Sequence, residues 1–382
     1  MTVPAVKGDT TSWQAQCGPL EPYLRDPSVT EIMVNGPARI FIEQKGLIKK
    51  TSAKFDTPEQ LNTLMQTMAR AVGKTLDSHN PCVDGRLPDG SRINCVFPPV
   101  AVDGPALTIR KFSPNFLNHA QLIANGFMDD RLAYFLNCCV AARLSVLVSG
   151  GTGSGKTTLL NVLSSFIPAH ERVVSIEDAA ELKIRNENIV RLEARPTSLD
   201  EPGVSIRQLV VNALRMRPDR IIVGECRGSE AFDMLSAMNT GHEGSMTTIH
   251  ANSARDALRR LESLILLAAT DMPLKVIRQN ISSALQLVVQ VSRGTDGVRR
   301  LMEVIEVGGM EGEIILTQDI FRFVPVQNSS NAAGATPAGG LFKSMGFVPR
   351  FVQLFKERGV DFPKDFFNDG YTVRQIGGAK KS

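Results

Sequence analysis

The stretch at residues 144–158, LSVLVSGGTGSGKTT, constrains the fold of this chain more than any other. Its first six residues are apolar and β-rich, a pattern typical of a strand that is buried on both faces. A glycine-rich turn follows, and the next residues, KTTLLNVLSSFI, have apolar side chains at helical spacing. A strand, a glycine-rich turn ending in GKT and a helix together indicate a phosphate-binding loop, in which backbone N–H groups surround an anion at a helix N-terminus.

The loop residues predict that the chain binds a nucleoside triphosphate. Lys156 supplies a cation for the β- and γ-phosphates, and the hydroxyl of Thr157 is suited to bind Mg²⁺. The alternative is a glycine-rich turn that contains GKT by chance, but the correct strand and helix on either side make that alternative weak. We expect the nucleotide to contact Gly151, Thr152, Gly153, Ser154, Gly155, Lys156, Thr157 and Thr158.

The composition is that of an ordinary globular protein. The chain has 382 residues, enough for two domains with separate cores, and a formal net charge of +4, which does not favour nucleic acid as a partner. Six scattered cysteines without a C-x-x-C pair indicate neither a thiolate metal site nor a disulfide framework, so a reducing cytoplasm fits best. The amino terminus lacks the layout of a signal peptide, and no stretch approaches the ~20 apolar residues that span a bilayer.

The pattern along the chain predicts two domains. A small α+β domain with antiparallel strands comes first, and a regular alternation of strands and helices then predicts a mostly parallel sheet with an antiparallel extension. The last residues form either a small helical element or a tail docked on the larger domain, two interpretations that we weigh equally. The predicted segments are a disordered leader (1–18), the α+β domain (19–112), a linker (113–126), the α/β domain (127–325), a flexible linker (326–340) and a helical tail (341–382).

Acidic side chains follow two of the predicted parallel strands, at the sheet edge where such folds bind ligands. Glu225 comes after RIIVG, where a carboxylate can hold Mg²⁺ through a water and act as general base or water positioner. Gly224 stands where an aspartate is usual, so further acidic groups have to help. Glu177 and Asp178, after RVVSI, are the candidates, with Glu181 beside them. Taken singly, each carboxylate could equally be a neighbour of a helix N-cap.

Two histidines flank another predicted strand. His242 precedes SMTTI and His250 follows it, and we expect both to lie where a hydrogen-bond donor senses the γ-phosphate. A lone histidine is more often a structural residue. Together, however, the polar clusters at successive strand ends favour one catalytic site over four unrelated coincidences.

Four sequence boxes, in this order along the chain, resemble those of the type II/type IV secretion-system ATPase superfamily: GGTGSGKTT, SIEDAAEL, PDRIIVGECRGSEA and TGHEGSMTTIHANSA. The first half, with LEPYLRDPSVTEIMVNGPARIF and DGRLPDGSRINCVFPPVAVDGPALTIRKF, looks most like the tight-adherence (Tad/Flp) pilus-assembly ATPases, and the conjugation-type ATPases are close behind. The resemblance covers about residues 19–325.

The resemblance implies an α/β protein in which a PAS-like amino-terminal domain precedes a RecA-like P-loop NTPase domain. It implies a homohexamer that hydrolyses ATP with Mg²⁺ in the cytoplasm and moves an inner-membrane platform protein as its domains close and open. Arg92 and Arg110 match family arginines that reach the phosphates, where a guanidinium fork neutralises phosphoryl charge, although spacing alone would favour solvated strand arginines. No zinc is expected, because the tetracysteine spacing of some relatives is missing, and an extra amino-terminal docking domain is also missing.

Other functions remain open from the sequence alone. The chain could be an ATP-binding assembly or regulatory component with negligible turnover, an alternative that the glycine at position 224 keeps in play. It could also be a conjugation-type ATPase. A RecA-like DNA translocase is disfavoured, because the net charge is modest and no basic loop is interleaved with aromatic residues.

Overall fold

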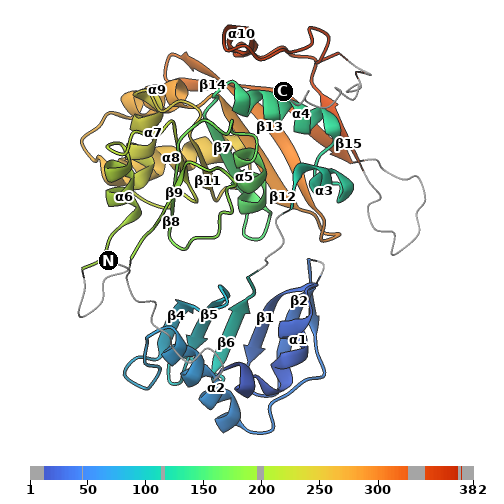
Figure 1. The fold of residues 1–382 in the computed structure, drawn as a ribbon, viewed down its shortest axis with the longest axis vertical. Helices are drawn as coiled ribbons and strands as arrows, with labels where there is room; N and C mark the ends of the chain where they lie inside the picture. Colours follow the sequence, from blue (N-terminus) through green and yellow to red (C-terminus); the bar gives the residue numbers. More distant parts are fainter. Residues whose placement is uncertain are drawn as a thin grey trace. The chain divides into compact units, whose positions relative to one another are not determined.

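A computed structural model of the chain describes residues 13–44, 46–112, 117–195, 202–325, 340–368 and 371. It has two compact units, Met1–Asn115 and Phe116–Ser382 (Figure 1). The boundary between them falls within residues 113–126, which the sequence predicts as a linker.

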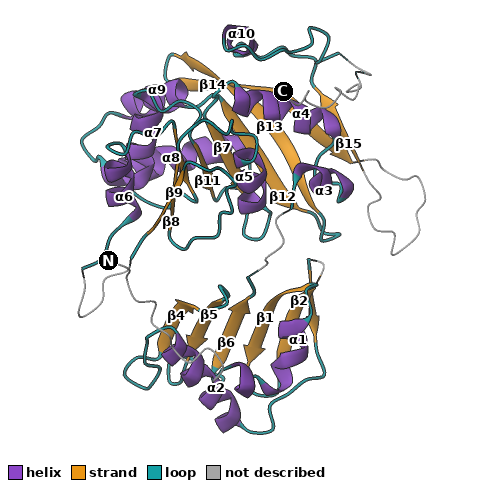
Figure 2. Ribbon diagram, viewed as in Figure 1, coloured by secondary structure: helices purple, strands orange, loops and turns teal. Residues whose placement is uncertain are grey.

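The amino-terminal unit is a six-stranded sheet with two α-helices, α1 (Glu21–Arg25) and α2 (Pro58–Ala71) (Figure 2). The strand order is β3-β2-β1-β6-β5-β4, and every neighbouring pair is antiparallel. The strands are β1 (Val29–Asn35), β2 (Ile40–Gln44), β3 (Leu47–Lys50), β4 (Cys82–Arg86), β5 (Arg92–Val96) and β6 (Ala106–Arg110). The start of helix α2 is capped by Thr57, whose Oγ1 accepts the N–H of Gln60 at 3.3 Å.

One face of this sheet forms the core of the unit together with α2. Five apolar side chains of the helix are fully buried there: Leu61, Leu64, Met65, Met68 and Ala69. Trp13 and Cys17, which are 2% and 1% exposed, belong to the same core. Residues 13–18, which the sequence assigns to a disordered leader, are thus part of the folded unit, since burial of the indole stabilises their position. Residues 1–12 lie outside the described residues.

The carboxyl-terminal unit contains a nine-stranded sheet in the order β15-β14-β13-β12-β7-β11-β10-β8-β9. The six strands β12, β7, β11, β10, β8 and β9 pair in parallel with their neighbours. Strands β13, β14 and β15 extend the sheet in antiparallel pairing, as the alternation in the sequence predicts. The strands are β7 (Val146–Gly150), β8 (Val173–Glu177), β9 (Ile189–Glu193), β10 (Arg220–Val223), β11 (Met246–Ile249), β12 (Leu287–Arg293), β13 (Arg299–Glu311), β14 (Ile314–Pro325) and β15 (Gly340–Ser344).

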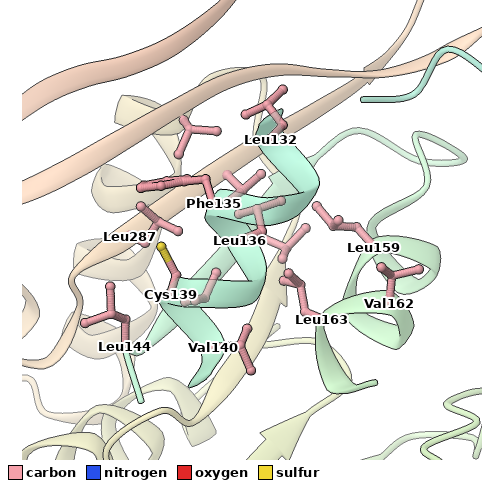
Figure 3. Packing of buried hydrophobic residues seen from close by; sticks show 14 of the residues in the cluster. Leu132, Phe135, Leu136, Cys139, Val140, Leu144, Leu159, Val162, Leu163 and Leu287 are labelled. Atoms are coloured by element: carbon pink, nitrogen blue, oxygen red, sulfur yellow. The ribbon is translucent and has the colours of Figure 1, made fainter. Parts of the chain in front are cut away.

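Helices cover both faces of the parallel part of the sheet. Within β7, Val146 and Val148 belong to one buried cluster and Leu147 to the other, so alternate side chains enter different cores. Figure 3 shows part of the first cluster, where α4 lies beside α5 and the side chains of Leu159 and Leu163 point from α5 toward α4. The helices are α3 (His119–Ala124), α4 (Asp130–Ala141), α5 (Lys156–Ser164), α6 (Ile206–Ala213), α7 (Glu230–Asn239), α8 (Ala254–Ala268), α9 (Leu274–Ala284) and α10 (Val352–Glu357). None of the described helices is long and apolar enough to cross a membrane.

Helix α3 lies inside the segment that the sequence predicts as a linker. Asn118 Oδ1 accepts the N–H of Gln121, and the side chain of Gln121 accepts the N–H of Asn118, so both halves of a capping box are present. Leu122 is buried in the larger unit. Residues 117–126 are therefore folded as part of that unit, and the local capping signal explains why.

The carboxyl-terminal segment is docked on the larger unit. Strand β15 pairs with β14, and the predicted helical tail contains one short helix, α10. Phe135 of α4 makes ring contacts with five aromatic residues: Phe321, Phe351, Phe362, Phe366 and Phe367. The docked-tail interpretation is thus the one that the described residues support. Residues 326–339, within the predicted flexible linker, lie outside the described residues.

A buried ion pair lies at the edge of the sheet where the parallel strands begin. Arg220, the first residue of β10, is fully buried, and its Nε and Nη2 lie 2.5 Å and 3.0 Å from the two carboxylate oxygens of Glu171. Arg220 Nη1 also donates to the carbonyl of Gly244 at 3.5 Å. This bidentate pair connects the segment before β8 to the start of β10.

Candidate nucleotide-binding site

The predicted phosphate loop connects β7 to α5. Gly150 has to be glycine, because a Cβ there would lie 2.4 Å from the carbonyl oxygen of Val291 and 2.5 Å from Ser154 Oγ. Gly153 and Gly155 have φ values of +68° and +100°, in the left-handed region that glycine adopts without strain. Ser154 Oγ donates to the carbonyl of Gly151 at 2.8 Å. The glycines therefore allow the tight turn that the sequence predicts.

Lys156 is the first residue of α5, and its side chain is 7% exposed. Its Nζ donates to the carbonyl oxygens of Gly150 and Gly151, both at 3.0 Å. The ring nitrogens of His250 lie 3.3 Å and 3.4 Å from the same ammonium group. Thr157 follows in the first turn of α5 and is half-buried. The ammonium group is thus held inside the curve of the loop.

Two side chains that the sequence does not single out also pack on the loop. Arg299, at the start of β13, donates from Nε to the carbonyl of Gly153 at 2.7 Å. A Cβ on Gly155 would lie 3.2 Å from the ring of Phe127 and 3.5 Å from Arg299 Cδ. No local pattern indicates these neighbours, because Arg299 comes from the antiparallel extension and Phe127 from the segment between α3 and α4.

His250 connects the loop to Glu225. It follows β11, next to β7, and its Nε2 lies 2.8 Å from Glu225 Oε1. Burial lowers the pKa of His250, and the nearby ammonium of Lys156 lowers it further, while Glu225 opposes both effects. The other carboxylate oxygen of Glu225, Oε2, accepts a hydrogen bond from Arg227 Nη2 at 2.7 Å. The structure therefore brings Lys156, His250 and Glu225 into one continuous cluster.

Glu177 ends β8 and is only 4% exposed. Its Oε2 accepts the N–H groups of Glu181 and Leu182 at 2.8 Å and 2.9 Å. Burial raises the pKa of Glu177, although these two hydrogen bonds counteract the shift. A Cβ on Gly224 would lie 3.0 Å from Glu177 Cγ. The glycine at position 224 thus leaves room for the Glu177 side chain, which supplies a carboxylate close to the place where an aspartate is usual.

The remaining acidic candidates lie on the same edge. Asp178 directly follows Glu177, and its Oδ2 accepts a hydrogen bond from Arg227 Nη1 at 3.3 Å. Glu181 takes part through its backbone N–H, which donates to Glu177. The sequence gives Arg227 one signal of a role at this site, its place two residues after Glu225 in the box GECRGSEA, whereas Asp178 is distant in the sequence.

His242 does not join this cluster. It precedes β11, whereas His250 follows it, and β11 runs parallel to β7. A four-residue strand is ~13 Å long, so the two histidines lie at opposite edges of the sheet. His242 therefore does not lie beside the phosphate loop of its own chain. It precedes β11, at the edge where the parallel strands begin, whereas the loop follows β7 at the edge where they end.

Arg92 and Arg110 lie in the amino-terminal unit. They are directly opposite each other on the antiparallel strands β5 and β6, so their side chains project from the same face of the sheet. Arg86 on β4 continues the row, and Glu31 on β1 flanks Arg110 on the other side. This face is opposite the one that packs on α2. The row presents three guanidinium groups on three neighbouring strands.

The residues of the larger unit fit a triphosphate with a hard cation. Three buried oxygens near the ends of the parallel strands have no aligned hydrogen-bond partner among the described residues: Ser149 Oγ, Glu177 Oε1 and Glu225 Oε1. Oxygen atoms of this kind suit Mg²⁺ and its bound water. In the described part of the chain no group of three His, Cys, Asp or Glu could hold a metal ion by itself. Mg²⁺ at this site would therefore depend on phosphate oxygens as well.

The sequence is similar to a family model and to curated conjugal transfer proteins. A family model described as type II/IV secretion system protein matches residues 14–306. A putative conjugal transfer protein of Mycobacterium tuberculosis is 38% identical over 304 residues, which cover 78% of this chain and 86% of the relative. The conjugal transfer protein TrbB of Rhizobium radiobacter is 35% identical over 314 residues, 81% of this chain and 92% of the relative.

Solved structures agree on the fold. The X-ray structure of the Legionella pneumophila ATPase DotB has a TM-score of 0.53 to this chain at 18% sequence identity, and the match covers 81% of this chain and 84% of that one. The family model covers well over half of the chain, and the ordered boxes of the sequence lie within it. The chain belongs to the family of type II/IV secretion system proteins.

Proposed function

We propose that the chain is a Mg²⁺-dependent ATPase that powers a type II/IV secretion or pilus apparatus by converting ATP and water into ADP and phosphate. One observation carries this proposal: His250 contacts both Lys156 of the phosphate loop and Glu225 at the end of β10. A cation for the phosphates and a carboxylate for the attacking water are groups that phosphoryl transfer uses, and here a histidine connects them.

The described residues have distinct tasks in this proposal. The loop N–H groups and Lys156 bind the phosphates, and the Thr157 hydroxyl and Glu225, the latter through a water, would hold Mg²⁺. When bound, Mg²⁺ supplies Lewis-acid stabilisation of the phosphoryl charge. Glu225 accepts a proton from the attacking water or orients that water, and the buried carboxylate of Glu177 assists it. His250 links the state of the γ-phosphate to Glu225.

The amino-terminal unit completes the proposal. We assign Arg92 and Arg110 to the phosphates, because two guanidinium groups on adjacent strands can neutralise a developing charge together. In this view the unit is PAS-like, the larger unit is RecA-like, and closure of one on the other is the work step. Arg92→Ala is expected to lower ATP turnover at least 10-fold, and unchanged turnover in Arg92→Ala and Arg110→Ala would remove both arginines from the mechanism.

The proposed assembly is a homohexamer on the cytoplasmic face of an inner membrane, attached through a platform protein. The family membership and the names of the relatives support association with a secretion apparatus. The sequence of the first half favours a Tad/Flp pilus, whereas the conjugal transfer relatives favour a conjugation-type system as the second candidate. Light scattering with ATP tests the hexamer, and co-purification with a pilus platform protein or with mating-pore components distinguishes the two systems.

Steady-state phosphate release by the purified full chain tests the activity. We expect Mg²⁺-dependent turnover that Lys156→Ala abolishes together with nucleotide binding. Glu225→Gln is expected to lower turnover at least 100-fold while a fluorescent ATP analogue still binds. Glu357→Gln, which changes an exposed carboxylate on α10, serves as the matched control and should leave turnover unchanged.

Two outcomes would change the assignment. Normal turnover in Glu225→Gln would show that another group is the base. Nucleotide binding without turnover in the unaltered chain, with and without its membrane partner, would favour an ATP-binding assembly or regulatory component instead.

A further inference from the structure

Arg227 bridges the ends of two neighbouring strands. Its Nη2 donates to Glu225 Oε2 at 2.7 Å, and its Nη1 donates to Asp178 Oδ2 at 3.3 Å. Glu225 follows β10 and Asp178 follows β8, and these strands are adjacent and parallel, with Val223 opposite Ile176. A guanidinium group, with its fixed fork of donors, suits this geometry better than an ammonium group does.

The loop that carries Arg227 is held by its own residues. Glu230, at the start of α7 and 7% exposed, accepts the N–H groups of Arg227 and Gly228 at 2.5 Å and 2.7 Å. A Cβ on Gly228 would lie 3.2 Å from Glu230 Oε2, so a glycine is favoured at this turn. The N–H of Cys226 donates to the carbonyl of Thr248 at 2.9 Å, which ties the same loop to β11. The guanidinium group therefore projects from a fixed backbone.

The Glu225 carboxylate consequently has a neighbour on each side. His250 Nε2 lies 2.8 Å from Oε1 without an aligned hydrogen bond, whereas Arg227 Nη2 donates to Oε2, so rotation of the carboxylate breaks the hydrogen bond with Arg227. The Arg227 side chain is 57% exposed and that of Asp178 is 43% exposed, and a pair this open to solvent contributes little to stability. Its effect is therefore expected on the orientation of the carboxylates rather than on the folding free energy.

We infer that Arg227 is a positioning residue that bridges Glu225 and Asp178 and keeps the Glu225 carboxylate in the orientation in which it acts on water. This inference rests on the proposed function, because it requires ATP hydrolysis at this site. The described side-chain hydrogen bonds of Arg227 go to Asp178 and Glu225, not to the phosphate loop or Lys156. Loss of the Arg227 side chain should therefore affect the chemical step more than nucleotide binding.

Kinetics of the full chain test the inference. We expect Arg227→Ala to lower kcat at least 10-fold while KM for ATP changes less than 3-fold, the signature of an interaction needed in the transition state. Arg227→Lys should recover part of the lost kcat, since one ammonium group can pair with one of the two carboxylates. Asp178→Asn should also lower kcat, and the double variant with Arg227→Ala should be less impaired than the product of the two single effects.

Arg322 provides a matched control. Its Nη2 lies 2.5 Å from Asp319 and 3.5 Å from Glu303, and its side chain is 48% exposed, so it also bridges two carboxylates, but on β13 and β14. Arg322→Ala should leave kcat and KM unchanged. Circular dichroism melting of every variant checks the fold, and if Arg227→Ala fails to fold, Asp178→Asn alone decides the inference.

The outcomes separate the two proposals. Turnover within 2-fold of the unaltered chain in Arg227→Ala, or a raised KM with unchanged kcat, would overturn the inference and leave the proposed function intact. Additive effects of the two substitutions would overturn the bridge. Absence of turnover in the unaltered chain would overturn the proposed function, and the inference with it.

Discussion

The buried pair of Arg220 and Glu171 allows a sharp test of what stabilises the larger unit. We predict that Glu171→Gln lowers the free energy of unfolding of that unit by ~3–5 kcal/mol, because it leaves the fully buried guanidinium without its counter-charge. Glutamine has nearly the shape of glutamate, so no cavity adds to the cost. For a domain of this size the corresponding fall in Tm is roughly 10 °C.

Two optical signals separate the units. The chain has one tryptophan, Trp13, and it is buried in the amino-terminal core. Its fluorescence therefore reports the unfolding of that unit, whereas far-UV circular dichroism reports both. We expect Glu171→Gln to shift the circular dichroism transition and to leave the Trp13 transition in place.

Two further variants complete this experiment. Arg259→Gln removes an exposed ion pair between Arg259, whose side chain is 77% exposed, and Asp256. It should lower the free energy of unfolding by less than ~1 kcal/mol. Replacing both members of the buried pair, Arg220→Met with Glu171→Leu, should recover most of the loss, because no isolated charge remains. A cost below ~1 kcal/mol for Glu171→Gln, or an equal shift of the Trp13 signal, would refute this reasoning.

Three other predictions concern separate parts of the larger unit. Burial raises the pKa of Glu306 above 4.5, so the folded state binds the carboxyl proton more tightly than the unfolded state does. The unaltered chain should therefore lose stability relative to Glu306→Gln as pH rises from ~4.5 through the folded pKa. Denaturant midpoints of both proteins at about pH 4 and about pH 7 measure this loss, and a difference that is the same at both pH values would contradict the prediction. Phe135→Ala should cost ~3–5 kcal/mol by circular dichroism, and a loss below ~1 kcal/mol would mean that the aromatic cluster is not tightly packed. Gly155→Ala should abolish binding of a fluorescent ATP analogue, because φ is +100° and Phe127 is close, so tight binding by this variant would disprove the strain argument.

The sequence predicted the phosphate loop and the acidic strand ends because their signals are local. The strand, the glycines and the GKT of the loop are contiguous. Glu177 is the last residue of a strand that is recognisable by its apolar residues, and Glu225 comes two residues after the end of another. Both carboxylates then reach the same edge because parallel strands begin and end together.

Other parts could not be predicted because they depend on packing between distant segments. The contact of Arg299 with the loop requires the pairing of β12 with β13, and the burial of Trp13 requires a core built mainly from later residues. His242 was misplaced because it was assigned to a strand end without regard to which end of β11 it occupies. The short helix α3 was overlooked, although Asn118 and Gln121 form a capping box that is visible in the sequence.

The Glu177 side chain lies against Gly224, and this close packing links the residue types that the two positions can hold. A side chain at position 224 would start 3.0 Å from the Glu177 side chain, so an acidic residue at 224 calls for a smaller one at 177. The negative charge at this edge can therefore be carried by either of two adjacent strands, and the two positions should covary among homologues. A variant that exchanges them, Gly224→Asp with Glu177→Ala, would transfer the carboxylate from one strand to the next without crowding.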